Sequence, residues 1–211
     1  MSRFAVSIIQ KWFHRPTTHG LMTGSRGFVW PMSYQLMDKA DRTTQPDYPS
    51  AAMLIIRLFT SIAAPPERVF DLARSIDAHQ RSAEGTHERA VAGVTHGLIG
   101  MGDEVTWEAR HFGIRQRLTV RVTEFERPAR FRDIMVSGAF KSMKHDHEFI
   151  PRPPGTLMVD RFEFESPFGI LGRIVDRIFL FAYMRRFLRR RNQVLKALAE
   201  SEDWRRYVTT A

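Results

Sequence analysis

Residues 168–200, FGILGRIVDRIFLFAYMRRFLRRRNQVLKALAE, form the stretch that decides the fold, and they contain no proline. Their apolar side chains recur at steps of three and four residues, which is the spacing that lines one face of an α-helix. The residues on this face are Leu171, Ile174, Ile178, Phe181, Leu188, Leu195 and Leu198. At about 1.5 Å per residue, one helix over the whole stretch would be roughly 50 Å long. A helix of that length must bury its apolar face against a broad partner, so we expect a sheet folded around it.

The composition is that of a globular protein with an excess of positive charge. The chain has 211 residues, of which 43% are hydrophobic and 26% charged, enough for one domain and some extra chain. The absence of cysteine excludes disulfides and thiolate metal sites and is compatible with a reducing cytoplasm. The formal net charge of +9 predicts attraction to anionic surfaces such as lipid headgroups or nucleic acid, without choosing between them.

No stretch of the sequence is apolar enough to predict a membrane-spanning helix. Spanning needs roughly 18–20 consecutive apolar residues, whereas the most apolar piece, 178–184, lies between Arg177 and Arg185. The N-terminal AVSII is too short for a signal peptide and is followed by Lys11 rather than by small residues. We therefore expect a cytoplasmic protein that makes, at most, peripheral contact with an anionic membrane.

The first fifty residues differ from the rest of the chain. They contain no acidic residue before Asp38 and show no sustained hydrophobic period, so we expect little independent structure there. The first residues, which include Phe4 and Trp12, could instead form a short helix at a membrane surface. A dispensable extension with a later start, at Met37 or Met53, is the other alternative. The predicted organisation is an extension over 1–50, a globular domain over 51–200 and a tail over 201–211.

After this extension the sequence alternates between strand-like and helical patterns. The run LIIRLFTSIAA, residues 54–64, is rich in β-branched residues and ends at two prolines. Proline is favoured in the first turn of a helix, so PPERVFDLARS predicts a helix over 65–75, and IDAHQRSAE predicts a second over 76–84. Between residues 88 and 165 the apolar period changes to two, which predicts antiparallel strands. These strands are expected near 88–94, 103–112, 114–126, 131–137, 139–150 and 157–166.

Alternation along the strands assigns one apolar and one charged face to the sheet. In 103–112, Trp107 and His111 point one way, whereas Glu104 and Glu108 point the other. We expect the charged face to be solvated and the apolar face to cover the long helix. The inward set is Val105, Trp107, Ala109, His111, Ile114, Gln116, Leu118, Val120, Val122, Phe131, Asp133, Met135, Met143, His145, His147, Phe149, Met158, Asp160, Phe162 and Phe164.

Three segments resemble bacterial members of the START-like superfamily, also called the helix-grip fold. They are APPERVFDLARSIDAH at 64–79, GLIGMGDEVTWEARHFGIRQRLTVRVTEFERPARFRDIMVSGAFKSMKHDHEF at 97–149, and the closing helix. The superfamily includes polyketide cyclase/dehydrase and lipid-transport proteins, coenzyme Q-binding proteins and the birch-pollen-allergen group. The resemblance covers roughly 53–200 and implies an α+β fold, with a curved antiparallel sheet wrapped around a long C-terminal helix and two short helices after the first strand. It implies little about function, because this fold supports many ligands and several unrelated chemistries.

The resemblance implies a cavity between the sheet and the long helix, a setting suited to an apolar or amphipathic small molecule. We predict that a hydrophobic small molecule binds there, in contact with Trp107, His111, Gln116, Leu118, Val120, Phe131, Met135, Met143, His145, His147, Phe162, Ile178 and Phe181. Some inward residues are ionisable, and buried charges require partners. These residues, which are also the candidate catalytic residues, are His111, Asp133, His145, His147 and Asp160.

Two roles are open for this ionisable group. A His paired with an Asp can orient a ligand carbonyl or hydroxyl, or move a proton in a cyclisation, dehydration or hydrolysis. Alternatively, the group is a satisfied polar network that holds the strands in register. We predict carriage or sensing of a small molecule, and the alternative is an enzyme of the cyclase, dehydratase or hydrolase type.

The spacing His145-x-His147 puts two imidazoles on one face of a strand, where Asp133 or Asp160 could complete a two-His, one-carboxylate metal site. Such spacing is common by chance, so we expect neither a metal nor another cofactor. The turn GLIGMGD at 97–103 has three glycines but no following Lys-Ser/Thr or helix, so it is not a phosphate-binding loop. We expect an irregular connection between strands there.

The densest positive charge lies in RRFLRRR at 185–191, followed by Lys196, Arg205 and Arg206. On a helix these side chains spread over much of the circumference, so some must face solvent as a basic patch. The patch could dock on anionic lipid and make the chain a membrane- or macromolecule-interacting module. The other alternative is a solvated helix face paired with Glu and Asp. No nucleic-acid-binding motif accompanies the patch, so we expect no specific nucleic-acid binding.

Overall fold

A computed structural model describes residues 53–111, 113–165 and 179–208 of the chain. The predictions for residues 1–50 lie outside the described part. So do those for residues 168–178, the first part of the predicted long helix, which includes the predicted ligand contact Ile178. In order, the described elements are β1 (Leu54–Ile62), α2 (Pro66–Ala73), α3 (Ile76–Ser82), η1 (Glu84–Thr86), β2 (Arg89–Gly93), β3 (Glu104–His111), β4 (Ile114–Glu126), β5 (Arg130–Ser137), β6 (Ser142–Arg152), β7 (Gly155–Glu165), α5 (Phe181–Glu200), η3 (Glu202–Trp204) and α6 (Arg205–Val208).

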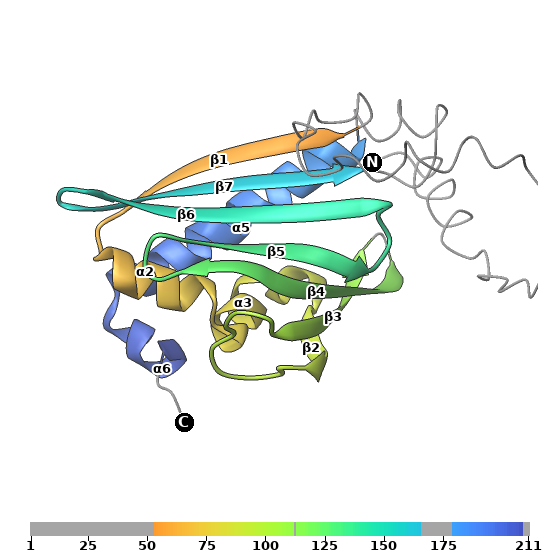
Figure 1. The fold of residues 1–211 in the computed structure, drawn as a ribbon, viewed down its shortest axis with the longest axis horizontal. Coiled ribbons are helices and arrows are strands. Elements are labelled where there is room, and N and C mark those ends of the chain that lie inside the picture. Colours follow the sequence, from red (N-terminus) through yellow and green to blue (C-terminus); the bar gives the residue numbers. More distant parts are fainter. Residues whose placement is uncertain (1–52, 112, 166–178, 209–211) are drawn as a thin grey trace, which may run out of the picture. The chain divides into compact units, whose positions relative to one another are not determined.

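The described strands form a seven-stranded antiparallel sheet in the order β1-β7-β6-β5-β4-β3-β2. The chain therefore meanders from β2 to β7, and β1 lies at the edge beside β7. Figure 1 shows α5 crossing one face of this curved sheet, with the shorter α2 and α3 near one end of α5. The α+β helix-grip architecture predicted from the sequence is confirmed.

The two short helices begin where the sequence predicts, each for its own reason. Pro66 occupies the first turn of α2, where its missing N–H would have had no helical partner. α3 follows Ser75, whose side chain accepts a hydrogen bond from the backbone N–H of Ala78 at 3.2 Å. The glycine turn is tied to the same point, because the backbone N–H of Ile76 donates to the carbonyl of Gly97 at 2.9 Å. The start of α3 is therefore held both by its cap and by this turn.

The inner face of the sheet and α5 share one apolar core. Phe164 is fully buried, and it belongs to the same cluster as Val120 of β4 and Leu188 of α5. A second cluster surrounds Phe70 of α2, whose ring meets three aromatic rings edge to face. These rings are Phe125, Phe131 and Phe149, with centroids 5.2, 5.5 and 5.3 Å from that of Phe70. The inward alternation predicted for β6 and β7 is confirmed, since its members there are all buried.

The outer face of the sheet differs from the solvated charged surface that we expected. Glu108, Asp146 and Glu163 belong to this face, yet they are only 5%, 9% and 4% exposed. Arginine side chains cover them; Arg89 and Arg117 donate to the two carboxylate oxygens of Glu108 at 2.9 and 3.1 Å. The expectation holds for the exposed arginines of this face and is wrong for these carboxylates. Alternation along a strand assigns a residue to one side of the sheet, whereas burial on that side depends on side chains from neighbouring strands.

The described part of α5 is amphipathic. It buries Met184, Leu188, Asn192 and Ala199 and exposes most of its arginines. Among the residues that the structure describes, no helix combines the length and the apolar character needed to cross a bilayer. After α5, the residues 202–208 form η3 and α6, which pack beside α2; the guanidinium of Arg68 lies 4.6 Å from the ring centroid of Trp204.

Candidate functional site

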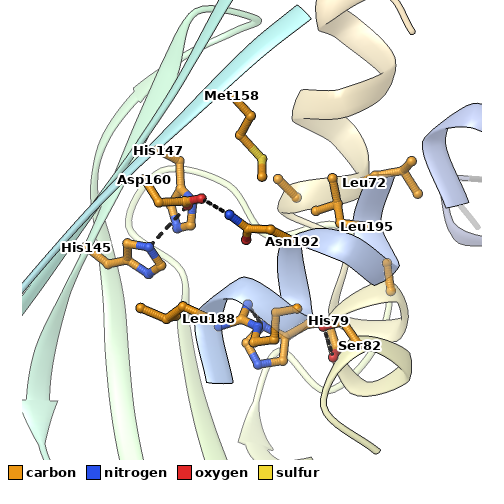
Figure 2. Close-up of a pocket in the computed structure, with 13 residues that line it drawn as sticks. Leu72, His79, Ser82, His145, His147, Met158, Asp160, Leu188, Asn192 and Leu195 are labelled. Atoms are coloured by element: carbon orange, nitrogen blue, oxygen red, sulfur yellow. Dashed lines mark hydrogen bonds and ion pairs between the residues drawn. The ribbon is translucent and has the colours of Figure 1, made fainter. Parts of the chain in front are cut away.

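A small pocket lies between α5, the short helices α2 and α3, and the inner face of β6 and β7, as Figure 2 shows. Its cavity volume is about 20 Å³, enough for about one water molecule. The lining residues are Leu72, Ala73, Ala78, His79, Ser82, His145, His147, Met158, Asp160, Leu188, Arg191, Asn192 and Leu195. A molecule larger than water must displace some of these side chains, so a ligand-sized cavity remains a prediction.

Asp160 of β7 is the centre of the polar lining. It is 2% exposed, and its Oδ1 lies 2.8 Å from Nδ1 of His147 and 3.3 Å from Nε2 of His145. Both histidines belong to β6, whose register places His147 directly opposite Asp160. On the other side of β6, Oδ2 of Asp133 on β5 lies 3.5 Å from Nε2 of His147. Antiparallel pairing therefore brings residues of three strands into one cluster.

Asn192 connects α5 to this group. Its Nδ2 donates to Oδ2 of Asp160 at 2.5 Å and to Oγ1 of Thr60 on β1 at 3.2 Å. Figure 2 shows the Asn192 amide pointing from the helix toward the Asp160 carboxylate. The two carboxylate oxygens thus have different partners, one in the helix and one in the sheet. The residues Asp133, His145, His147, Asp160 and Asn192 are called the Asp160 cluster below.

Charge within the Asp160 cluster is balanced by His147. Burial opposes a charged imidazole, but the two flanking carboxylates, Asp133 and Asp160, outweigh it and raise the pKa of His147 to about 9. Burial also acts against the two carboxylates, yet the neighbouring histidines hold the pKa values of Asp133 and Asp160 below their usual range. Burial and the charge of His147 both lower the pKa of His145. At neutral pH the cluster therefore holds two carboxylates, one imidazolium and one neutral imidazole.

A second buried network lies on the α3 side of the pocket. Nη2 of Arg191 lies 2.8 Å from Nδ1 of His79, and Nε2 of His79 lies 2.9 Å from Oε1 of Glu88. Because a guanidinium can only donate, Nδ1 accepts and Nε2 carries the proton that is donated to Glu88. The ring of His79 also stacks on Trp107, with centroids 3.8 Å apart. Arg191, His79 and Glu88 are called the His79 chain below.

The His79 chain keeps its histidine neutral. Burial and the positive charge of Arg191 lower the pKa of His79, and Glu88 only partly opposes them. Burial acts against the Glu88 carboxylate as well, but His79 and Arg191 outweigh it and lower the pKa of Glu88. The chain is therefore a guanidinium and a carboxylate that are bridged by a neutral imidazole.

His145 is the pocket histidine with a ring nitrogen free of described partners. Both nitrogens of His79 are engaged, and both nitrogens of His147 face carboxylates. In His145 only Nε2 approaches a partner, Asp160, and Nδ1 makes no hydrogen bond or ion pair with a described residue. Nδ1 of this buried ring is therefore available as a proton acceptor, beside the Asp160 carboxylate.

Polar atoms of the pocket also lack aligned hydrogen bonds among the described residues. They are Nε2 of His145, Nδ1 of His147 and Nε of Arg191, all of them buried. The first two lie within ion-pair distance of Asp160, but their N–H directions do not meet its oxygen. Buried polar groups normally have partners, so such atoms indicate a place for water or for a polar group of a ligand.

A metal could use some of the same atoms. One donor atom from each of Asp133, His145 and His147 lies within 4.8 Å of the other two, which is the two-His, one-carboxylate set considered above. An ion there would have to displace the proton that His147 holds between two carboxylates. The expectation of no metal stays a prediction.

The matched family agrees with this fold. Residues 53–200, well over half of the chain, match the family described as polyketide cyclase / dehydrase and lipid transport. The chain belongs to this family. The resemblance to the START-like superfamily is thereby confirmed. No curated protein matches the chain.

Solved structures with the fold of this family member come from bacteria and from a plant. The Zhui aromatase/cyclase from Streptomyces sp. R1128 is 15% identical, with a TM-score of 0.57 over 70% of this chain and 94% of its own. Protein CV1439 from Chromobacterium violaceum is 20% identical, with a TM-score of 0.55 over 70% and 98%. The ginseng major latex-like protein 151 from Panax ginseng is 13% identical, with a TM-score of 0.54 over 70% and 98%. At these identities the likeness establishes the fold alone.

The predicted site residues of this family member divide into several groups. His145, His147 and Asp160 line the pocket, and Asp133 adjoins it. Trp107, Leu118, Val120, Met135, Met143, Phe162 and Phe181 belong to the apolar core around α5, and Phe131 belongs to the cluster around Phe70. Gln116 and His111 do not line this pocket; Nδ1 of His111 lies 2.7 Å from the hydroxyl of Tyr183, and burial lowers the pKa of His111. Ile178 lies outside the described residues.

Sequence reasoning missed three members of the two networks. Asn192 lies four residues after Leu188 and three before Leu195, so a polar residue on the apolar face of the helix was the signal that could have identified it. Arg191 was hidden among neighbouring arginines, and Glu88 stands at a strand end without any distinguishing pattern. From its place in the second short helix, His79 is predicted either at the mouth of the cavity or as a half-exposed helix residue. It lines the pocket, and its side chain is 14% exposed and hydrogen-bonded at both nitrogens.

Proposed function

We propose that this chain carries or senses a hydrophobic or amphipathic small molecule between the inner face of the sheet and α5. The observation that supports this function is the set of buried polar atoms without aligned partners, which adjoin apolar side chains such as Leu188 and Met158. An amphipathic molecule would satisfy both, with its polar group on the Asp160 cluster and its apolar part against the core. Burial of apolar ligand surface would drive binding at about 25 cal/mol per Å².

Binding requires α5 or the lining side chains to move. Polar contacts that tie α5 to the sheet and to α3 near the pocket include those of Asn192 with Asp160, Arg191 with His79, and Tyr183 with His111. A ligand that enters between helix and sheet competes with these contacts.

We place the protein in the cytoplasm, with no specific nucleic-acid ligand and no metal or other cofactor.

The test is native mass spectrometry of the freshly purified full chain, followed by organic extraction of whatever is bound. We expect one apolar or amphipathic molecule per chain. Ala73→Leu adds volume at the pocket wall and leaves less room for a ligand, so the bound fraction should fall clearly below that of the unmodified chain. The matched control is Ala182→Leu on the exposed side of α5, which should retain the ligand. A chain that is empty and takes up neither fatty acids nor quinones would contradict the proposal.

A second candidate, an enzyme that moves a proton, is favoured by His145 alone. Its Nδ1 is free of described partners and its Nε2 lies 3.3 Å from Oδ1 of Asp160, so a buried imidazole that can accept a proton stands beside a carboxylate. The reaction would be a cyclisation, dehydration or hydrolysis. If the extracted molecule is turned over, His145→Ala should lower the rate by about 10²–10⁴-fold, whereas His87→Ala, an exposed residue, should leave it unchanged. Equal turnover by both variants would remove His145 from the mechanism.

A further inference from the structure

The outer side of α5 concentrates positive charge without any acidic neighbour in the helix. Before its last residue, Glu200, α5 contains no Asp or Glu. Four of its arginines are exposed: Arg185, Arg186, Arg189 and Arg190. None of the four makes an ion pair or a hydrogen bond with a residue that the structure describes. The face they form is called the arginine face below.

Many other cations of the described chain have partners, whereas Arg57, Arg110 and Arg152 are single exposed arginines on strands of the sheet and not part of a cluster on one helix face. On the outer side of the sheet, Arg121 pairs with Glu104, and Arg132 pairs with both Glu124 and Asp146. Within the basic run itself, Arg191 turns inward to His79, and farther along α5 Nζ of Lys196 lies 2.8 Å from Oε1 of Glu200. The alternative of a helix face paired with Glu and Asp is therefore wrong for the arginine face within the described residues.

The arginine face lowers the stability of its own helix. Arg185 and Arg189, like Arg186 and Arg190, are four residues apart, and like charges at this spacing repel across one helical turn. An external layer of negative charge would relieve this repulsion for all four side chains at once. Charge complementarity therefore indicates an anionic partner.

An exposed aromatic ring stands at the start of the same face. Phe179 lies two residues before Phe181, the first residue of α5, and is 40% exposed. It lies seven residues before Arg186 and eleven before Arg190, which is two and three helical turns, so the three side chains share one side. Clustered cations on a helix are attracted to anionic headgroups, and an exposed aromatic ring beside them adds apolar surface that can insert at the same level.

We propose that the arginine face, with Phe179, docks on the surface of an anionic phospholipid bilayer. A bilayer is a continuous layer of phosphates that can meet all four guanidinium groups together, while Phe179 inserts at the level of the headgroups. A single-stranded nucleic acid is a poorer match, because its binding sites present several aromatic rings for base stacking. On the described part of α5 and the residues just before it, Phe179 is the one large apolar side chain that is exposed.

The test uses the full chain and sedimented vesicles of phosphatidylcholine, with or without about one-third phosphatidylglycerol. Each arginine near an anionic surface contributes about fivefold in partitioning, so R186Q/R190Q should lower the partition coefficient by about 25-fold. The matched control is R121Q/R130Q, which removes two exposed arginines that have carboxylate partners and changes the net charge equally. This control should partition within about twofold of the unmodified chain, and roughly 0.5 M salt should abolish the difference between the two variants. F179A should weaken binding without changing the salt dependence.

Other outcomes would overturn the proposal. Equal losses in R186Q/R190Q and R121Q/R130Q would show that net charge, and not this face, attracts the protein. Partitioning that is independent of phosphatidylglycerol would exclude recognition of anionic lipid. If a single-stranded RNA binds more tightly than the vesicles and R186Q/R190Q abolishes that binding, the face serves nucleic acid and the lipid proposal fails. Residues 1–50 are the same in all variants, so any contribution from them cancels.

Discussion

The two buried networks beside the pocket both join histidine to carboxylate, but His147 is charged whereas His79 is neutral. His147 lies between two carboxylates, which outweigh burial and raise its pKa to about 9. His79 has a carboxylate partner too, yet burial and Arg191 lower its pKa. One carboxylate is therefore not enough to charge a buried histidine; the balance of all neighbouring charges decides. The Asp160 cluster depends on ionic attraction, whereas the His79 chain depends on directed hydrogen bonds.

Asp160→Asn should have the largest effect on stability, because it removes the carboxylate shared by two histidines and leaves His147 with one. Loss of one partner from a buried ion pair costs about 3–5 kcal/mol, to be measured by urea denaturation. The control is Glu126→Gln, which breaks an exposed ion pair with Arg130 and should change the free energy of unfolding by less than about 1 kcal/mol. If Asp160→Asn also cost less than about 1 kcal/mol, ionic attraction would not be what stabilises the cluster.

The pH dependence of stability should be shaped by His147. Because its pKa rises from 6.5 in the unfolded chain to about 9 in the folded one, its stabilising contribution is complete below pH 6.5. That contribution is lost as pH rises through about 9, up to about 3 kcal/mol in total. His147→Gln should remove this alkaline decline in denaturation midpoints measured between about pH 6 and 10. An unchanged slope in the variant would assign the decline to another group.

Below neutral pH, folding stability should change with pH in the opposite direction. The lowered pKa values of His79, His111 and His145 keep these histidines neutral in the folded chain at a pH where the unfolded chain binds protons. Stability should therefore fall as pH drops below about 6.5, so the maximum should lie near neutrality. A maximum below about pH 5 would contradict the neutral state assigned to these histidines.

Glu88→Gln should have a smaller effect than Asp160→Asn. The amide oxygen can still accept the proton of His79, so the expected loss is about 1–2 kcal/mol. Since Glu88 raises the pKa of His79 against burial and Arg191, the variant should lower that pKa further, as measured by NMR titration of the imidazole. A loss equal to that of Asp160→Asn would erase the distinction between the two networks.

R186Q/R190Q should have the smallest effect on stability. Both side chains are exposed and lack described partners, and their repulsion at four-residue spacing is removed. The melting temperature should stay the same or rise slightly. The corresponding gain in the free energy of unfolding is at most about 0.5 kcal/mol. A clear loss would show that these arginines support the fold, which would also remove the variant as a clean test of lipid docking.

Much of the fold and part of the site could be predicted from the sequence, because they depend on local periodicity. Apolar residues at every second position were sufficient to place His145, His147 and Asp160 on the inner face of the sheet. Apolar residues at steps of three and four predicted the helix against which they pack. Their mutual contacts depend on register, which sets His147 opposite Asp160 and Asp133 opposite His145. Local alternation carries no information about these cross-strand partners.

The remaining errors involve residues whose environment is built from distant segments. Arg191 faces inward only because α3 brings His79 to it across 112 positions of sequence. Glu108 is buried on the charged face because arginines of β2 and β4 cover it. Neither residue differs locally from exposed arginines and glutamates elsewhere in the chain, so no pattern within a few residues could have identified it.

The position of β1 beside β7 also has a consequence for biosynthesis. Leu54 pairs with Phe164 and Ile62 with Thr156, so β1 leaves the ribosome roughly a hundred residues before its partner strand. At about 5–20 residues per second, β1 waits for roughly 5–20 s. During that interval the side chains of Ile56 and Leu58, buried in the folded protein, have no sheet to cover them. The domain must therefore close after most of it has been translated, and its first strand is where we expect a chaperone to bind the nascent chain.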